Sequence, residues 1–273
     1  MRNLDRTGEI HTMRTAGIDC GAENTKSVVL KDGRIIGKGK VSTGYDLAAS
    51  AEASLDQALR EAGVSREDLD RIVGTGSGKD CIMAAALKVD DIQGMCKGAH
   101  FLFPEARTVV DVGAEEGRVA KLDKNGEPED VAFNEKCAAG SGTFIETMSR
   151  ALEIPLEEMG PLALTSDRDI PMNAQCAVFS ESEVVGLLHA GTEKRDISKS
   201  IHDAMARRIV TMVRRIGVNE DVVMVGGVAC NPGIVAALKR GLGLKTIFIP
   251  EDPEFTAALG AAVAAAEQGQ RGV

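Results

Sequence analysis

The sequence predicts an α/β protein made of two related lobes, because one segment occurs twice and helical patterns follow each copy. The first copy, GIDCGAENTKSVVLKDGRII, begins at Gly17. The second copy, VVDVGAEEGRVAKLDKNGEP, begins at Val109. Both contain Asp-x-Gly-Ala-Glu, so the chain is expected to build the same unit twice.

Each copy has the pattern of three consecutive β-strands. An apolar strand ends at an acid, Asp19 or Asp111, and a glycine turn and an alternating second strand follow. A tight turn, Asp32-Gly33 or Asn125-Gly126, then begins the third strand. The pattern predicts a β-meander that is used twice.

Helical patterns alternate with further strands after each meander. Helices are predicted at 46–62, with Asp46 as N-cap, and at 140–152, 180–189, 196–216 and, from Asn231-Pro232, in the region that follows; strands return at 71–74, 221–226 and 245–249. We expect an N-terminal extension at 1–14, a first lobe at 15–104, a second lobe at 105–252, and a last helix, 253–268, packed back on the first lobe.

Composition narrows the class of protein. The 273 residues are 44% hydrophobic, enough for one large core or two modest ones. A net charge of -9, without a basic cluster interleaved with aromatic residues, argues against nucleic-acid binding. No apolar run approaches the roughly 20 residues that cross a bilayer, and the opening lacks a signal-peptide core, so we expect a cytoplasmic protein with no membrane partner.

The glycine turns are candidate phosphate sites. Glycine lets backbone amides approach a phosphate, and an acid at a strand end can hold magnesium or orient water. A third element, VVMVGGVACN, places a glycine pair before a helix. The candidates are Asp19, Gly21, Asn24, Thr25 and Lys26 in the first turn, Asp111, Gly113, Ala114 and Glu115 in the second, and Gly226, Gly227 and Asn231 in the third element.

Each of these signals also has an ordinary structural explanation. Asp-x-Gly closes many hairpins, Gly226-Gly227 is equally typical of a plain strand-to-helix connection, and a strand lysine such as Lys26 is usually just solvated. Two matched turns followed by the glycine pair favour nucleotide binding over these alternatives. Six cysteines in a chain of this kind indicate free thiols or metal ligands rather than a disulfide framework.

Five motifs together resemble a known family. The order GIDCGAENTK, VVDVGAEEGR and VVMVGGVACN resembles the phosphate-1, phosphate-2 and adenosine motifs of actin, sugar kinases and heat-shock chaperones. NEKCAAGSGTF and CAVFSESEV resemble one branch, the activases of 2-hydroxyacyl-CoA dehydratases and the related ATPase subunits of benzoyl-CoA reductase. Within it, PEARTVVDVGAEEGR and TAGID look closer to the D-type subunit of that reductase.

The resemblance implies a duplicated actin-like (ribonuclease H-like) fold with a nucleotide cleft between the lobes. It implies ATP and ADP as ligands, Asp19, Asp111 and Glu115 as catalytic groups, and magnesium at Asp19 and Asp111. Several dehydratase activators carry glutamine where this chain has Glu115, so whether Glu115 or Glu116 assists hydrolysis stays open.

The resemblance further implies that Cys137 and Cys176 hold a 4Fe-4S cluster, with two equivalent cysteines from a second copy or a homologous subunit. Cys137 is expected beside a helix N-terminus whose free amides and dipole suit an anionic cluster. ATP hydrolysis would tilt that helix and drive an electron, received from a ferredoxin or flavodoxin, onto an acyl-CoA dehydratase or reductase. The remaining cysteines, Cys20, Cys81, Cys96 and Cys230, are expected to be packing residues.

Two other functions share this fold. A small sugar or amino-sugar kinase would use the same nucleotide cleft, but the cysteine motifs would have no role in it. A non-catalytic partner subunit would keep the fold and lack ATPase activity.

Overall fold

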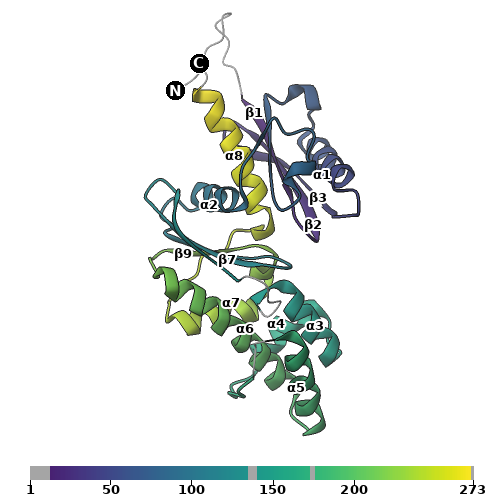
Figure 1. Cartoon of the computed structure of the whole chain (residues 1–273), viewed down its shortest axis with the longest axis vertical. Coiled ribbons are helices and arrows are strands. Elements are labelled where there is room, and N and C mark those ends of the chain that lie inside the picture. Colours follow the sequence, from purple (N-terminus) through teal and green to yellow (C-terminus); the bar gives the residue numbers. More distant parts are fainter. Residues whose placement is uncertain (1–12, 135–139, 173–175, 272–273) are drawn as a thin grey trace, which may run out of the picture. The chain divides into compact units, whose positions relative to one another are not determined.

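The computed structural model describes residues 13–134, 140–172 and 176–271 (Figure 1). The chain divides into two compact units. Unit 1 comprises the chain up to Leu102 together with the chain from Phe255 on, and unit 2 comprises Phe103–Glu254. No helix in the described parts is both long and apolar enough to cross a membrane.

Unit 1 is a five-stranded sheet with the order β3-β2-β1-β4-β5. The first three strands are antiparallel, and β4 and β5 continue the sheet in parallel. Its elements are β1 (Arg14–Cys20), β2 (Asn24–Lys31), β3 (Arg34–Ser42), α1 (Leu47–Ala62), β4 (Arg71–Thr75), β5 (Leu87–Lys88), α2 (Asp91–Leu102) and α8 (Thr256–Arg271), with short 3-10 turns at Arg66–Asp68, Lys79–Cys81 and Pro253–Phe255.

Helices cover both faces of the unit 1 sheet because β1 alternates its side chains between two cores. Ile18 packs into the core shared with Leu55 of α1. On the opposite face, Gly17 leaves room for α8, where a Cβ would overlap the Ala258 carbonyl group. The C-terminal helix therefore packs directly on the central strand of unit 1.

Unit 2 repeats this arrangement with a four-stranded sheet, β8-β7-β6-β9. Figure 1 shows its helices gathered along this sheet. Its elements are β6 (Thr108–Val112), β7 (Gly117–Leu122), β8 (Pro128–Phe133), α3 (Gly142–Leu152), α4 (Leu156–Ala163), α5 (Ala177–His189), α6 (Lys194–Ile216), β9 (Val222–Val225), a 3-10 turn (Gly227–Cys230) and α7 (Pro232–Leu242). The core combines β6 residues such as Val110 with Phe144 and Met148 of α3 and Ile201 of α6.

The duplication predicted from the sequence is confirmed in the strand register. Asp19 lies opposite Lys26 on β1 and β2, and Asp111 lies opposite Arg118 on β6 and β7. In each unit the strand that carries the acid also pairs in parallel with a later strand, β4 or β9. Asp46 is the N-cap of α1, accepting a hydrogen bond from the Ala49 amide at 3.0 Å.

Several element boundaries differ from the prediction by a few residues, and α3, α6 and α8 begin at 142, 194 and 256 instead of 140, 196 and 253. The predicted strand 245–249 is reduced to one bridge between Val223 and Phe248, because Pro250 follows closely and has no amide to extend the ladder. Strand β9 ends at Val225, since Gly226 adopts a φ of 82°. Helix α5 begins at Ala177 rather than Ser180.

Candidate functional site

The first turn presents a buried acid paired with a lysine. Asp19 is the last residue but one of β1, its side chain is 11% exposed, and its Oδ2 lies 3.0 Å from Nζ of Lys26. A Cβ on Gly21 would lie 2.9 Å from the Asn24 carbonyl oxygen and 3.4 Å from the Lys26 ammonium group. Glycine thus keeps the approach to this ion pair open.

Thr25 supports the first turn from inside unit 1. Its side chain is fully buried, and its hydroxyl lies 2.8 Å from that of Thr43 and 3.7 Å from Sγ of Cys20. The Thr43 hydroxyl also donates to the Gly21 carbonyl at 2.9 Å. Thr25, one of the predicted nucleotide contacts, is therefore buried and supports the backbone of the turn. The other two, Asn24 and Lys26, are only partly buried.

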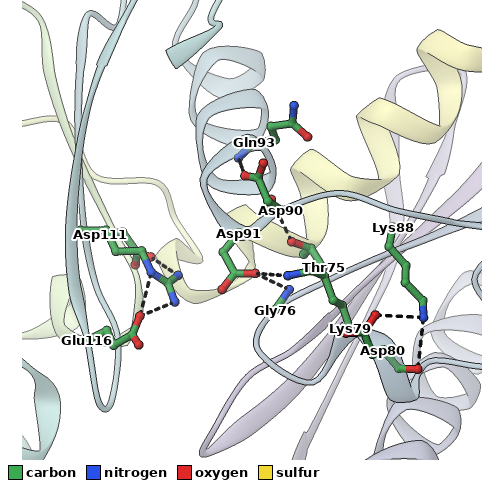
Figure 2. Close-up of polar contacts among 11 residues, drawn as sticks. Thr75, Gly76, Lys79, Asp80, Lys88, Asp90, Asp91, Gln93, Asp111 and Glu116 are labelled. Atoms are coloured by element: carbon green, nitrogen blue, oxygen red, sulfur yellow. Dashed lines mark hydrogen bonds and ion pairs between the residues drawn. The ribbon is translucent and has the colours of Figure 1, made fainter. Parts of the chain in front are cut away.

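The second turn contains the equivalent pair with one addition. Arg118 Nη1 donates to Asp111 Oδ2 at 3.4 Å, and Arg118 Nη2 donates to Glu116 Oε2 at 2.9 Å (Figure 2). The Gly113 amide closes the turn by donating to the Glu116 carbonyl at 2.9 Å. Glu115 is exposed, whereas Glu116 is held by the arginine.

Each acid is backed by a glycine with positive φ. A Cβ on Gly226, after β9, would overlap Oδ1 of Asp111, and a Cβ on Gly76, after β4, would lie 2.5 Å from Oδ1 of Asp19. The sequence prediction included Gly226 but missed Gly76. The run Gly74-Thr-Gly-Ser-Gly78 after a predicted strand was the signal that could have found it.

Asp91 fixes the Gly76 loop within unit 1. Its Oδ1 accepts the Gly76 amide at 3.1 Å and lies 3.6 Å from Nζ of Lys79. The Thr75 hydroxyl adds a 3.3 Å hydrogen bond to the Asp90 carbonyl (Figure 2). The start of α2 thereby holds the glycine that packs against Asp19.

Asn231, predicted as a nucleotide contact, is the N-cap of α7. Its Oδ1 accepts the amides of Gly233 at 2.9 Å and Ile234 at 3.3 Å, and it lies 3.1 Å from Nε2 of His202. Burial lowers the pKa of His202 and outweighs the opposing contacts with the Ser198 carbonyl and Asn231. The Asn231 oxygen is therefore engaged inside unit 2, whereas Gly227 is exposed at the 3-10 turn.

The second turn is hydrogen-bonded to the N-terminus of α3. The Gly142 amide donates to the Gly113 carbonyl at 2.8 Å, and the Thr143 amide donates to the Ala114 carbonyl at 2.8 Å. The Thr143 hydroxyl adds a 2.7 Å hydrogen bond to the same Ala114 oxygen. The expectation of free amides at this helix start is therefore wrong for Gly142 and Thr143, because the turn takes both.

The cysteines differ in their surroundings. Cys137 lies outside the described residues, and Cys176 is half-buried as the N-cap of α5. Cys20 and Cys96 are buried, as expected for packing residues, but Cys230 is exposed and does not fit that expectation. Within residues 13–134, 140–172 and 176–271, no group of three or more His, Cys, Asp or Glu side chains could hold a metal ion.

These features define the class of protein. Two units whose first four strands have the same order, each with an acid and a glycine turn at the end of its first strand, make up the duplicated actin-like ATPase fold. Component A of the (R)-2-hydroxyglutaryl-CoA dehydratase of Acidaminococcus fermentans has a similar structure, with a TM-score of 0.91 and 34% identity over 94% of this chain and 99% of that one.

The sequence match extends over almost the whole chain. Residues 16–265 match the BadF/BadG/BcrA/BcrD ATPase family, and the chain belongs to that family. It is 38% identical to the activator of lactoyl-CoA dehydratase of Anaerotignum propionicum, covering 95% of this chain and 100% of the relative. The D-type subunit of the benzoyl-CoA reductase of Thauera aromatica is 30% identical, with 91% and 92% covered, so identity to the activator is the higher of the two.

Proposed function

We propose that this chain hydrolyses ATP to drive low-potential electrons, through a 4Fe-4S cluster shared with a second chain, onto an acyl-CoA dehydratase or reductase. Family membership and the similarity to dehydratase activators support this function. The observation that carries it is the direct hydrogen bonding of Gly113 and Ala114 to the start of α3, the helix that follows Cys137. The candidate nucleotide turn is thereby hydrogen-bonded to the helix that begins five residues after Cys137 in the sequence.

The two acid–cation pairs supply the groups that Mg-ATP needs. Asp19 in unit 1 and Asp111 in unit 2 are each a proposed ligand for magnesium, a hard cation that binds carboxylate oxygens and neutralises phosphate charge. Lys26 and Arg118 each lie beside one of these acids at a glycine turn, and they would add positive charge near the phosphate oxygens. The amides around Gly21, Gly113 and Gly227 would contact the phosphates and the nucleoside.

Glu115 is the better candidate to orient the attacking water. Glu116 is bound by Arg118, which both fixes it and offsets its charge. Glu115 is exposed on the same turn, one residue after Ala114. A carboxylate in that position can accept a proton or a hydrogen bond from water.

Cys176 fits a cluster ligand that is shared between chains. Four thiolates normally hold a 4Fe-4S cluster, and this chain would contribute only Cys137 and Cys176. Cys176 is partly accessible at the start of α5, beside the small residue Ala177, and the next residues, Val178 and Phe179, are 67% and 69% exposed. The cluster would supply a one-electron carrier, and the second chain would be another copy or a homologous subunit.

ATP binding would be coupled to the proposed cluster through α3 and α5. Closure of the second turn around the γ-phosphate would shift the Gly113 and Ala114 carbonyls and, with them, the amides of Gly142 and Thr143. Helix α3 packs against α5, so the movement reaches the helix that Cys176 caps. A ferredoxin or flavodoxin would reduce the protein, and the acyl-CoA enzyme would accept the electron.

An anaerobic preparation tests the cluster. We expect brown protein with about two iron atoms per chain, since one 4Fe-4S cluster is shared by two chains. Cys137→Ser and Cys176→Ser should each lose the iron while retaining ATP binding, and the exposed Cys230→Ser should keep it. Full iron content in both ligand variants would reject the assignment. Iron-free, colourless wild-type protein with sugar-stimulated ATP turnover would identify a kinase instead.

A further inference from the structure

The chain that follows β4 is a glycine-rich loop that packs on the first predicted acid. This Gly76 loop, residues 76–79, leads from the end of β4 into the 3-10 turn Lys79–Cys81. Gly76 has a φ of 92°, and a Cβ on it would lie 2.5 Å from Oδ1 of Asp19. The loop therefore lies directly against a carboxylate that is a proposed magnesium ligand.

Hydrogen bonds fix the Gly76 loop and leave its tip exposed. The Gly76 amide donates to Asp91 Oδ1 at 3.1 Å, and the Gly78 amide donates to the Cys20 carbonyl at 2.9 Å. Both glycines are buried, whereas Ser77 between them is exposed. A ligand can therefore reach the tip of the loop without displacing a buried group.

Lys79 places a weakly held cation at the end of the loop. Its Nζ lies 3.6 Å from Asp91 Oδ1, and the two side chains are 30% and 20% exposed (Figure 2). This distance is longer than a hydrogen bond, and an ion pair open to solvent contributes little to stability. Lys26, in contrast, lies 3.0 Å from Asp19 and is 14% exposed. Lys79 can therefore exchange its carboxylate partner for another anion at small cost.

Unit 2 holds the equivalent glycine without a charged group. Gly226 follows β9 as Gly76 follows β4, and each has a positive φ and packs on the acid of its own unit. The Gly226 amide donates to the Pro253 carbonyl at 3.0 Å. A neutral acceptor is thus enough to hold such a glycine. Support of the loop explains the hydrogen bond from Gly76 to Asp91, but it does not explain the charge pair with Lys79.

We propose that the Gly76 loop is a further phosphate-binding element of unit 1, in which Lys79 exchanges Asp91 for a phosphate oxygen of the nucleotide. The inference rests on the proposed function, because a magnesium ion on Asp19 would bring the phosphates of ATP to this loop. A lysine ammonium is a compact point charge on a flexible stem, and it suits a phosphate. Asp91 keeps the ammonium beside the loop when no anion is bound.

Binding of inorganic tripolyphosphate tests the loop separately from hydrolysis and from the cluster. In titration calorimetry with magnesium, Lys79→Met should weaken the binding of tripolyphosphate and of ATP by about 10-fold, because one charge-assisted contact is lost. AMP, which lacks the phosphates that magnesium bridges, should bind as to the wild type. Lys79→Arg should restore most of the affinity. Lys88→Met is the matched control, since Lys88 is 35% exposed and paired with Asp80 at 3.3 Å.

The exposed tip gives a second test that leaves Lys79 in place. Ser77→Glu should bind tripolyphosphate several-fold more weakly than its neutral counterpart Ser77→Gln, because a carboxylate at the tip repels the phosphates. Equal affinities in the wild type, Lys79→Met and both Ser77 variants would overturn the proposal. A wild type that binds tripolyphosphate through Lys79 but does not hydrolyse ATP would reject the proposed function and support the phosphate site. A wild type that binds neither anion would reject both.

Discussion

The two units share a strand order and an acid–cation pair, yet they support their glycine turns differently. In unit 1 the first turn is braced from within its own meander, where Thr43 bonds to the Gly21 carbonyl. In unit 2 the turn is bound instead by the amides of Gly142 and Thr143. The same turn is therefore bonded to the end of its own meander in unit 1 and to the start of a helix in unit 2.

The difference follows from what lies between the third and fourth strands of each repeat. Residues 43–70 of unit 1 contain one α-helix, whereas residues 134–221 of unit 2 contain α3 to α6 and both proposed cluster ligands. The larger insertion supplies a helix N-terminus to meet the turn. The two units thus carry two similar glycine turns, and the second is hydrogen-bonded to the start of α3, the helix that follows the proposed ligand Cys137 in the sequence.

Removal of either acid should have the largest effect. Asp19→Asn and Asp111→Asn are each expected to reduce ATP hydrolysis at saturating magnesium by about 100-fold, because each loses the charge of a proposed magnesium ligand. Phosphate release measures the effect, and Asp80→Asn, on an exposed residue paired with Lys88, is the control. Wild-type turnover in Asp111→Asn would remove the second turn from the reaction.

Variants of the two adjacent glutamates test which of them orients water and which supports the turn. Glu115→Ala should lower kcat about 10-fold with little change in KM, whereas Glu115→Gln should retain most activity because an amide can still orient water. Glu116→Ala should have the smaller effect on kcat, since Glu116 is bound by Arg118. A larger loss in Glu116→Ala than in Glu115→Ala would reverse the two roles.

Gly142→Val should weaken the connection that distinguishes unit 2. Even a Cβ at this position would lie 3.2 Å from both the Ala114 Cα and the Gly113 oxygen, so the two branches of valine must push the turn from the helix. We expect a several-fold smaller difference in iron release between the ADP and ATP states.

The control for Gly142→Val is Gly186→Val, because nothing lies within 4 Å of a Cβ built at Gly186. That variant should preserve the nucleotide-dependent difference in iron release. An unchanged difference in Gly142→Val would show that coupling does not pass through the Gly113–Gly142 contact.

The sequence was sufficient for the meanders and the fold class, because strand ends, turn glycines and their repetition are local signals. Asp32-Gly33, for example, occurs where the prediction placed it, between β2 and β3, with both residues at positive φ. The sequence did not reveal the roles of Gly76 and Asp91, because these roles depend on β4 lying beside β1. Such a parallel pairing joins residues far apart in the chain and leaves no periodic pattern.

The same limit explains why the α3 amides were expected to be free. The structure adds that Asn231 is the N-cap of α7, while its nucleotide contact stays a prediction. The amides of Gly142 and Thr143 belong to a helix start in any case, but their partners come from a turn that precedes α3 by about thirty residues. Only the tertiary fold decides which acceptor such a donor meets.

Replacement of His202, which lies in unit 2, should have the smallest effect of the predicted changes. The effect is on how the stability of the protein depends on pH. Burial lowers the pKa of His202 below the ordinary value of 6.5, so the folded protein binds fewer protons than the unfolded chain. The contribution of neutral His202 to the free energy of unfolding is fully present above about pH 6.5. It is lost as the pH falls from there toward the pKa of the folded state. Asp203 and Arg240, the charged groups that act on the ring, oppose each other, because the first raises the pKa and the second lowers it.

Thermal unfolding between pH 7 and pH 5 measures this effect. His202→Gln should lower Tm at pH 7, because its contacts with Ser198 and Asn231 are disturbed, yet should show a shallower fall in Tm on acidification than the wild type. The exposed His189→Gln should leave the wild-type slope unchanged. The carboxyls of Asp169 and Asp196, whose pKa values are lowered from 3.8, affect stability only at lower pH, so they do not mask the histidine. An equally steep fall in His202→Gln would assign the acid sensitivity to another group.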